Sequence, residues 1–334
     1  MVFDLRRALD ELRGRGQLLI LPHDNPDPDS MASALGLELL AKSVGVESTL
    51  GLGGIVGRAE NRAMVRELEI ALHPVEQLDL ARFDLVALVD TQPGTGNNSL
   101  PSGRIADVVI DHHPLRSESL TARWCDVREP AGATSTIVYG YLKELGLHLD
   151  SRLATAFLYA LKSETRELSR EAGPLERDAY VDLLPRADHA KLHAIVDPKV
   201  GRSHFVAVDR ALRAAEVRGD LVTANLGALD YPDLVAEVAD LLLPLDGAHW
   251  VLCDGQHRRT VFLSIRTDLP EAHAGALIRR LVSDHGAGGG HGMIAGGRLS
   301  RRVHSDGELT TVYEEMVQRL AVELRVAGTP SRLL

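Results

Sequence analysis

The sequence contains few cysteines and no long apolar run. Only Cys125 and Cys253 occur among 334 residues, and they form no CxxC pair. This scarcity argues against a disulfide framework or a zinc knuckle and favours a reducing compartment. No segment approaches the roughly 20 apolar residues that cross a bilayer, and residues 1–7 lack the basic-then-apolar order of a signal peptide. We therefore expect a cytoplasmic protein with no membrane partner.

Positive charge is also scarce. The chain has 37 Lys and Arg residues against 47 Asp and Glu residues, which gives a formal net charge of −10. A protein that binds duplex DNA normally needs a basic face to neutralise phosphates, so duplex DNA is not an expected partner. A short nucleotide in a local cationic pocket is still compatible with this charge. A cluster of carboxylates would need a compensating cation, and a bound divalent metal would supply it.

Length and composition suit a globular protein of two domains. A chain of 334 residues is too long for one typical core, and its 45% hydrophobic and 25% charged residues are ordinary values. We place the first domain at 1–190, a helical linker at 191–214 and the second domain at 215–334. The sequence shows no solenoid-type repeat and no low-complexity segment.

Apolar strands and helices alternate in the first domain. We expect strands at 17–21, 47–52, 84–90 and 107–111, and helices at 3–12, 30–44, 61–70, 134–145 and 151–161. This alternation is typical of an α/β fold with a mostly parallel sheet, which binds ligands at the carboxyl ends of its strands. A helical stretch at 175–208 should lead out of the domain. The second domain should contain a hairpin at 217–226, strands at 250–253 and 260–265, and a helix at 272–283.

The first group of candidate site residues follows the first strand, between His23 and Ser30. It offers one imidazole and the carboxylates of Asp27 and Asp29, in a loop that two prolines stiffen. Hard divalent cations prefer carboxylate oxygen, and manganese also accepts imidazole. The alternative is an acidic turn in which Ser30 is the N-cap of the following helix.

Two further groups follow later strands. Asp90 ends the strand at 84–90, and Asp111, His112 and His113 come at the end of the strand at 107–111. Alone, a terminal acid is commonly a turn or cap residue, and a surface His-His pair commonly has no function. With the first group, these residues would place six or seven ligand atoms at one edge of one sheet, which exceeds the needs of one metal. We therefore expect two metals about 3.5–4 Å apart, bridged by one carboxylate, as in sites for in-line displacement at phosphorus.

The order of these residues resembles the successive motifs of the DHH phosphoesterases. The motifs read His23-x-Asn25-Pro26-Asp27-x-Asp29, then Asp90, then Asp111-His112-His113. Near the C-terminus, Ser264-Ile265-Arg266 and Gly288-Gly289-Gly290-His291 are similar to the substrate-binding segments of the DHHA1 domain. The resemblance covers nearly the whole chain and is nearest to the branch of nanoRNases and pAp phosphatases. It implies a DHH domain followed by a smaller α/β DHHA1 domain with a mixed sheet.

The resemblance also implies a role for each residue. The first metal would be bound by His23 and Asp27, the second by Asp29 and His112, and both would be bridged by Asp90. His113 would meet the substrate phosphate, and Asp111 would orient the histidines. Substrate binding would fall to Arg266, Gly288, Gly289, Gly290 and His291. Taken without the resemblance, the glycine run also fits a flexible turn, and Arg266 also fits a solvated strand residue.

One residue departs from the family pattern. Where the family usually shows Asp-Thr, this chain has Glu164 before Thr165. Glutamate is also an oxygen ligand, so Glu164 can still complete the second metal site. Its extra methylene moves the carboxylate by about a bond length unless the backbone retreats, which puts the affinity of that site in question. The alternative is a surface glutamate at a helix end.

The function implied by the resemblance is hydrolysis of small phosphate esters with two divalent ions, expected to be Mn²⁺. The substrates would be RNA of two to a few nucleotides, or 3′-phosphoadenosine 5′-phosphate (pAp), bound between two lobes. Short single-stranded RNA or a small nucleotide is thus the expected partner, and a homodimer is left open. Two alternatives are retained: an exopolyphosphatase, and a weakly catalytic protein that mainly binds a signalling nucleotide.

Overall fold

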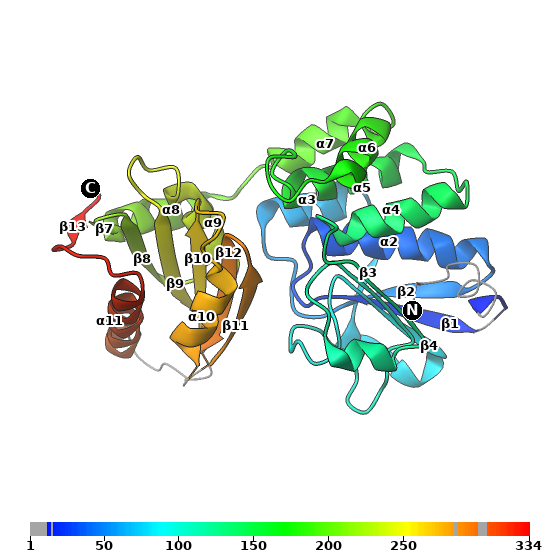
Figure 1. Ribbon diagram of the computed structural model, residues 1–334, viewed down its shortest axis with the longest axis horizontal. Coiled ribbons are helices and arrows are strands. Elements are labelled where there is room, and N and C mark those ends of the chain that lie inside the picture. The colour runs from blue at the N-terminus through cyan, green and yellow to red at the C-terminus, as the bar shows by residue number, and fades with distance from the viewer. Residues whose placement is uncertain (1–11, 15, 284–285, 300–305) are drawn as a thin grey trace. The chain divides into compact units, whose positions relative to one another are not determined.

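The computed structural model describes residues 12–14, 16–283, 286–299 and 306–334. The chain divides into two compact units, which meet in the sequence between Pro198 and Lys199. Apart from Leu12, the helix predicted at 3–12 lies outside the described residues. Figure 1 shows both units as sheets covered by helices, which is the predicted α/β class.

The first unit is built on a six-stranded sheet in which all neighbouring strands run parallel. Its strands are β1 (Gln17–Pro22), β2 (Glu47–Leu52), β3 (Leu72–Pro74), β4 (Leu85–Val89), β5 (Val108–Asp111) and β6 (Trp124–Val127). They lie in the order β3-β2-β1-β4-β5-β6, so the direction of winding reverses between β1 and β4. Open α/β sheets bind ligands outside the carboxyl ends of their strands at such a reversal.

Both faces of the sheet are buried at its central strands, which explains why β1 and β4 read as continuous apolar runs. Successive residues of a strand point to opposite faces. Leu18 and Ile20 of β1 therefore join the core beneath the helices. Leu19 and Leu21 join a smaller core, with Leu88 of β4, beneath loops and short 3₁₀ turns. These turns are η1 (Val75–Gln77), η2 (Leu80–Arg82) and η3 (Ser117–Thr121).

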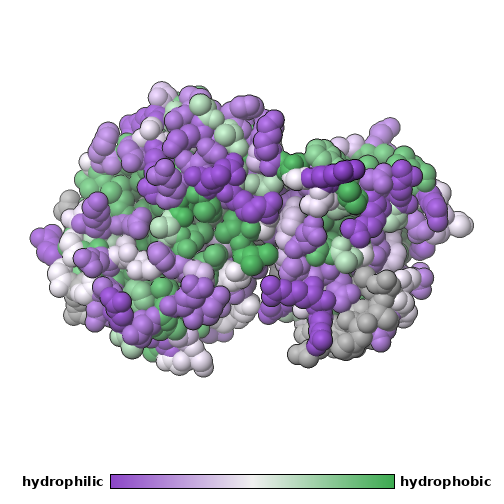
Figure 2. Space-filling model, turned by 180° about the vertical axis from the view of Figure 1, so that it is seen from behind, coloured by the Kyte–Doolittle hydropathy of each residue, from purple (hydrophilic) through white to green (hydrophobic). Residues whose placement is uncertain are grey.

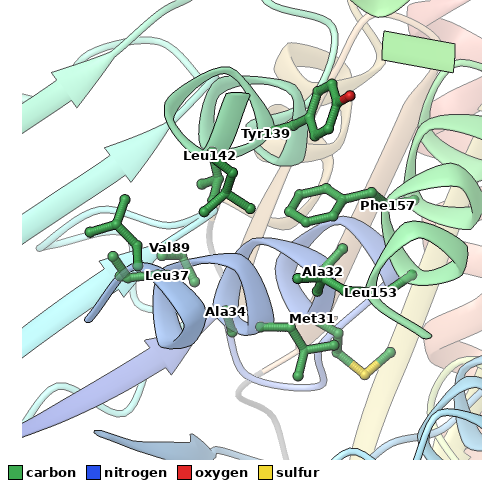
Figure 3. Packing of buried hydrophobic residues seen from close by; sticks show 14 of the residues in the cluster. Met31, Ala32, Ala34, Leu37, Val89, Tyr139, Leu142, Leu153 and Phe157 are labelled. Carbon is green, nitrogen blue, oxygen red and sulfur yellow. The ribbon is translucent and has the colours of Figure 1, made fainter. Parts of the chain in front are cut away.

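Helices α2, α4 and α5 form the layer over the first of these faces (Figure 3). The helices of this unit are α2 (Pro28–Ser43), α3 (Ala59–Glu67), α4 (Thr134–Glu144), α5 (Ser151–Glu164), α6 (Pro174–Leu183) and α7 (His189–Val196). Gly36 allows α2 to approach its neighbours closely. A Cβ atom at Gly36 would lie 2.6 Å from the Phe157 ring of α5 and 2.6 Å from Val138 of α4. The predicted mostly parallel, helix-flanked sheet is thus confirmed.

The start of α2 differs from the prediction. The N-cap is Asp27 rather than Ser30, and Pro28 occupies the first turn. The Asp27 carboxylate accepts a hydrogen bond from the Ser30 backbone N–H (2.9 Å), and the Ser30 hydroxyl accepts one from the Asp27 N–H (3.1 Å). This reciprocal pair is a capping box. Because Pro28 has a fixed φ and no N–H, the first helical position suits it, and the helix begins two residues earlier than predicted.

The stretch at 175–208, predicted to be helical, is helical but interrupted. The structure has three helices there: α6, α7 and α8 (Arg202–Ala214). The Asp188 carboxylate caps α7 by accepting from the backbone N–H groups of Ala190 and Lys191, both at 3.0 Å. Pro198 and Gly201 then separate α7 from α8, because proline lacks an N–H and glycine favours non-helical backbone.

The second unit is built on a seven-stranded mixed sheet, as predicted. Its order is β11-β12-β10-β9-β8-β7-β13, with β8 and β9 parallel and the other neighbours antiparallel. The strands are β7 (Glu216–Arg218), β8 (Leu221–Ala228), β9 (Trp250–His257), β10 (Thr260–Thr267), β11 (Gly286–His291), β12 (Ile294–Leu299) and β13 (Ser331–Arg332).

Helices cover both faces of this second sheet. One face packs against α10 (Ala274–Val282) and α11 (Asp306–Glu323). The other packs against α8 and α9 (Leu234–Leu242). In the described part of the chain, no helix is both long enough and apolar enough to cross a membrane. Hydrophilic residues cover much of the face shown in Figure 2, with hydrophobic residues between them on the first unit.

Candidate metal centre

The predicted ligands meet at one edge of the first sheet. His23 directly follows β1, Asp90 directly follows β4, and Asp111 is the last residue of β5. Because these strands are parallel neighbours, their carboxyl ends lie together, and the edge between β1 and β4 is the reversal point of the sheet. Asp90 adopts a left-handed backbone with φ of 59°. Aspartate tolerates this conformation better than most residues, and it turns the chain sharply at the end of β4.

Two groups of three donor residues share the Asp90 carboxylate. The first group is His23, Asp27 and Asp90, and the second is Asp90, His112 and His113, with the donor atoms of each group within 4.8 Å of one another. His23 Nε2 lies 3.5 Å from Asp27 Oδ1 and 3.7 Å from Asp90 Oδ2. On the other oxygen of Asp90, His112 Nε2 lies at 3.6 Å. Asp90 is therefore the one carboxylate that belongs to both groups of donors.

The electrostatics of this edge call for added positive charge. Burial, followed by repulsion from Asp29 and Asp27, raises the pKa of Asp90 well above its usual range. Burial alone would lower the pKa of His23, but the charge of Asp27 and the hydrogen bonds to Asp27 and to the Asp24 backbone together outweigh burial, and the pKa of His23 rises to about 9. Carboxylates and imidazoles crowded in this way suit hard or borderline divalent cations. The donor set therefore fits a divalent metal.

Asp29 belongs to neither of the two groups. It lies in the first turn of α2 and is 1% exposed. Its two oxygens accept hydrogen bonds from the backbone N–H groups of Thr134 (2.8 Å) and Ser135 (2.9 Å), at the N-terminus of α4. Burial raises the pKa of Asp29, and the nearby His112 opposes this rise. Each carboxylate oxygen has a second lone pair, so Asp29 can bind the helix and still offer a ligand atom.

Glu164 also lies near the acids without belonging to either group. It is the last residue of α5, and its carboxylate is 3.5 Å from Nη2 of the buried Arg170. Burial, then repulsion from Asp27 and Asp29, raises its pKa. The chain reaches Arg170 through three consecutive residues with positive φ, from Arg166 to Leu168. This left-handed turn returns the guanidinium to Glu164, where Nη2 also donates to the Glu164 carbonyl (2.6 Å).

Hydrogen bonds fix the orientation of both adjacent histidines. His112 Nδ1 lies 3.1 Å from the Ala131 carbonyl, which directs Nε2 towards Asp90. His113 Nδ1 lies 2.9 Å from Asp111 Oδ1 and therefore holds a proton there. The nitrogen that His113 turns towards Asp90 is this same Nδ1. His113 is thus poorly suited as a metal ligand, and its ring is more exposed than that of His112.

Four buried residues around the ligands were not predicted from the sequence. Thr134 Oγ1 donates to Asp90 Oδ1 (2.8 Å), and Asn61 Nδ2 donates to the carbonyl of the residue preceding Asp27 (3.3 Å). Glu176 accepts from the Gly132 N–H (2.9 Å), next to the carbonyl that holds His112, and Gln92 donates to Asp111 (2.7 Å). Three of them carried a signal as residues suited to helix starts: Asn61, Thr134 and Glu176.

The predicted substrate-binding residues lie in the second unit. Arg266 is buried in β10, where Nε donates to Asp240 Oδ1 (2.7 Å) and Nη1 donates to Ser264 Oγ (2.8 Å). Its guanidinium is therefore engaged within the unit. Gly288, Gly289 and Gly290 form part of β11, paired with β12, rather than a loop. The backbone of His291 ends this strand, and its side chain lies outside the described residues.

Glycine is required where β11 meets α10. A Cβ atom at Gly275 would lie 1.8 Å from the Gly290 carbonyl oxygen, so only glycine lets the helix start this close to the strand. Gly290 has a φ of 140°, a conformation that other residues rarely adopt. A Cβ at Gly289, in contrast, would meet open space. The glycine run is thus closely packed at Gly290, against α10, whereas Gly289 has open space where a side chain would lie.

Comparisons with curated proteins give one long match and several shorter ones. An uncharacterised protein of Methanocaldococcus jannaschii is 32% identical over 316 residues, which are 93% of this chain and 64% of that protein. A probable manganese-dependent inorganic pyrophosphatase of Bacillus licheniformis is 28% identical over 151 residues, or 45% of this chain and 48% of that protein. The chain thus spans less than two thirds of the length of these relatives.

Comparisons with solved structures support the fold. An exopolyphosphatase-related protein from Bacteroides fragilis has a TM-score of 0.71 at 14% identity, covering 97% of this chain and 99% of that chain. RecJ in complex with Mg²⁺ from Thermus thermophilus has a TM-score of 0.50 at 16% identity, covering 98% of this chain and 52% of that chain. At such identities the likeness concerns the fold alone.

The family comparison covers the segment that holds the ligand-bearing strands. Residues 17–161 match the family described as DHH family, N-terminal domain. This segment contains His23, Asp27, Asp90 and the two histidines that follow Asp111, in the parallel sheet described above. Glu164 falls three residues beyond the matched segment. The chain therefore carries a DHH family domain, followed by a second α/β unit with a mixed sheet.

Proposed function

We propose that this chain is a manganese-dependent phosphoesterase that hydrolyses short oligoribonucleotides, such as the dinucleotide pApA, or pAp to mononucleotides. The observation that carries the proposal is the buried Asp90 carboxylate, shared by two groups of donors, with the oriented His113 beside it. A shared carboxylate between two donor groups is the arrangement used by two-metal phosphate hydrolysis. The similarity to probable manganese-dependent enzymes supports manganese as the metal.

Each residue has a proposed part in the centre. His23, Asp27 and Asp90 hold the first ion, and Asp90 is shared with the second. Asp29, His112 and Glu164 complete the second site. When bound, two divalent ions would supply a nucleophilic hydroxide and neutralise charge on the attacking and leaving oxygens. His113 acts on the substrate through Nε2, while Asp111 holds the Nδ1 proton. When Nε2 also carries a proton, the ring can stabilise charge or give that Nε2 proton to the leaving oxygen, and the neutral ring remains on Asp111.

The second unit would bind the distal part of the substrate. Gly289 has open space where a side chain would lie, so its backbone N–H can approach an anion, and His291 is the proposed donor at the end of the strand. Gly288 and Gly290 shape the same strand. For Arg266 we propose a supporting part in this surface. Its Nη1 also lies 3.4 Å from the carbonyl of Ala295, the residue that pairs with Gly290.

A second candidate function is hydrolysis of a phosphoanhydride, as by an exopolyphosphatase. The similarity to probable manganese-dependent inorganic pyrophosphatases favours it. The substrate in the name of these relatives is pyrophosphate, which contains no nucleobase. The two functions share the metal centre and differ in what the second unit must recognise. A nucleotide substrate needs contacts beyond one phosphate chain, which is the part proposed for the glycine-containing strand.

The test is a substrate panel with purified protein and Mn²⁺. Mononucleotide release from pApA and phosphate release from pAp are compared with hydrolysis of pyrophosphate and tripolyphosphate. Asp90→Ala should lose at least about 100-fold of the activity, since it removes a ligand rather than an outer partner. Asp79→Ala, which removes an exposed acid at the N-cap of η2, is the matched control and should retain activity. Polyphosphate hydrolysis alone would favour the second candidate, and tight nucleotide binding without turnover would favour a sensor.

A further inference from the structure

Gln92 is a buried amide at the junction of two loops that follow neighbouring strands. It is 1% exposed and lies two residues after Asp90, beyond the left-handed turn that ends β4. Its own backbone carbonyl accepts hydrogen bonds from Asn98 Nδ2 and Thr95 Oγ1, both at 2.8 Å. The loop after β4 is therefore closed on itself, and the Gln92 side chain is directed into the loop after β5.

The neighbours of Gln92 determine which way its amide faces. Oε1 accepts from the Arg116 backbone N–H and from Ser119 Oγ, both at 2.8 Å. Nε2 donates to Asp111 Oδ2 (2.7 Å) and to the Pro114 carbonyl (3.1 Å). A flipped amide would turn its oxygen towards a carboxylate and a carbonyl, and would leave two donors without an acceptor. The amide therefore has one favourable orientation, with its donor on Asp111.

Asp111 carries this constraint to the histidines. Its other oxygen, Oδ1, accepts from the His112 backbone N–H (2.8 Å) and from His113 Nδ1 (2.9 Å). The carboxylate is thus held at both oxygens, by Gln92 on one side and the His-His pair on the other. Its burial at 1% exposure means that water does not replace a lost partner without rearrangement. Gln92, Asp111 and His113 form a continuous hydrogen-bonded chain.

We propose that Gln92 is a positioning residue that orients the His113 ring through Asp111. The inference rests on the proposed phosphoesterase function, in which His113 acts on the substrate. Without the Gln92 donor, Asp111 Oδ2 loses this partner and the carboxylate is held through Oδ1, so the plane of the His113 ring is less firmly fixed. Misplacement of a reacting group by about 1 Å can cost on the order of 100-fold in rate. Gln92 itself does not touch the substrate, so substrate affinity should depend on it little.

The first experiment compares Gln92→Met with the wild type on the substrate that the panel identifies. Methionine preserves the length and approximate volume of glutamine and removes its hydrogen bonds. We expect kcat to fall about 10–100-fold, with KM little changed. Losses of this size are typical for residues that orient a ligand side chain by a hydrogen bond without contacting the metal or the substrate. Gln77→Met, at an exposed position on η1, is the matched control and should leave both constants unchanged. An unchanged kcat in Gln92→Met would overturn the proposal.

The second experiment asks whether Gln92 acts through Asp111. If it does, the double variant Gln92→Met/Asp111→Asn should be no slower than Asp111→Asn alone. The Gln92 hydrogen bond can orient His113 only through the Asp111 carboxylate, which Asp111→Asn has already removed. Multiplied effects would mean that Gln92 acts independently, and would contradict the proposed chain. Gln92→Glu serves as a second, isosteric variant should Gln92→Met fold poorly. It places two carboxylates in contact and should lower kcat at least as much.

A third readout does not depend on turnover. In protein with ¹⁵N-labelled histidine, the proton on His113 Nδ1 should give a protected signal because of its bond to Asp111. Asp111→Asn and His113→Ala identify this signal, and Gln92→Met should shift or broaden it. A signal that persists unchanged in Gln92→Met overturns the proposal even if the panel finds no substrate. A wild-type protein that shows the signal yet hydrolyses nothing would instead refute the proposed function.

Discussion

Asp29 and Thr134 are 105 residues apart in the sequence, and the carboxylate of the first accepts the backbone N–H of the second at 2.8 Å. Ser135 donates to the other oxygen at 2.9 Å. Ala133, the formal N-cap of α4, makes no side-chain capping bond. Asp29 therefore caps α4 from another helix, and a proposed metal ligand also stabilises the fold.

This double role predicts that Asp29→Ala destabilises the metal-free protein. Removal of a capping carboxylate costs about 0.5–2 kcal/mol, and the α4 N-terminus would have no replacement acceptor from Ala133. The Asp29→Asn variant retains one side-chain oxygen, so its stability should fall between those of the wild type and Asp29→Ala. Urea unfolding in the presence of a chelator measures the difference without any contribution from metal. Equal free energies of unfolding for wild type and Asp29→Ala would show that the cap is unimportant.

Asp90→Asn should have the opposite effect on the metal-free protein. The pKa of Asp90 is raised first by burial and then by Asp29 and Asp27, so its ionised form opposes folding. The wild type should therefore lose stability as pH rises above the unfolded value near 4, and Asp90→Asn should lose less. At neutral pH we therefore expect the metal-free Asp90→Asn variant to be more stable than the metal-free wild type. Thermal unfolding in the presence of a chelator tests the predicted stability of the metal-free variant. Thermal unfolding with Mn²⁺ tests the loss of the ligand, because only the wild type should be strongly stabilised by the metal.

Glu164→Ala should weaken one metal-binding event and spare the other. Glu164 lies near Asp27 and Asp29, yet the group of His23, Asp27 and Asp90 is complete without it. Titration calorimetry with Mn²⁺ should show two events in the wild type, one of which becomes at least about 10-fold weaker in the variant. Glu167→Ala removes a more exposed carboxylate that pairs with Lys162 and is the control. If both events keep their affinity, Glu164 is not a ligand.

In the second unit, Asp254 predicts a pH dependence that involves no metal. Burial raises its pKa to about 8, although Asn225 Nδ2 donates to both of its oxygens at 3.0–3.2 Å. The folded state keeps this proton up to about pH 8, whereas the unfolded state loses it near pH 4. Folding therefore takes up a proton between these values, and stability falls as pH rises, by up to about 1.4 kcal/mol per pH unit.

Asp254→Asn should flatten this dependence, because the amide does not ionise. Trp124 lies in the first unit and Trp250 in the second, so a Trp124→Phe background reports on the second unit by the fluorescence of Trp250. Urea unfolding between pH 5 and pH 8 then gives the slope with and without the Asp254→Asn substitution. The same slope in both proteins would mean that another group takes up the proton.

The strands that carry the centre were predictable because both faces of the sheet are buried. Continuous apolar runs located β1 and β4 within one residue at each end, and β2, whose sequence is more polar, was predicted at its observed bounds. The acids and imidazoles at the ends of these runs could then be assigned to one edge, since parallel strands share a direction. This argument needs only the pattern of the chain and no knowledge of side-chain contacts.

Other parts depend on contacts that no local pattern contains. The amide of Gln92 reaches Asp111 only because the loops after β4 and β5 meet in the folded protein, and the sequence alone does not show this contact. Strand β11 is made largely of glycine, which has no side chain to show an alternating pattern, so a turn was an equally good interpretation. Helix α9 was missed although its apolar spacing was present. The apolar face that this spacing produces packs against the second sheet.

The first sheet ends in two very short strands, β3 with three residues and β6 with four. Such edges offer few unpaired N–H and C=O groups on which another chain could add a strand. The last residue of β3 is Pro74, which has no N–H to donate. On β6, Asp126 is already engaged by Arg128 and Tyr141. The all-parallel sheet is thus protected at both margins against edge-to-edge aggregation and strand exchange.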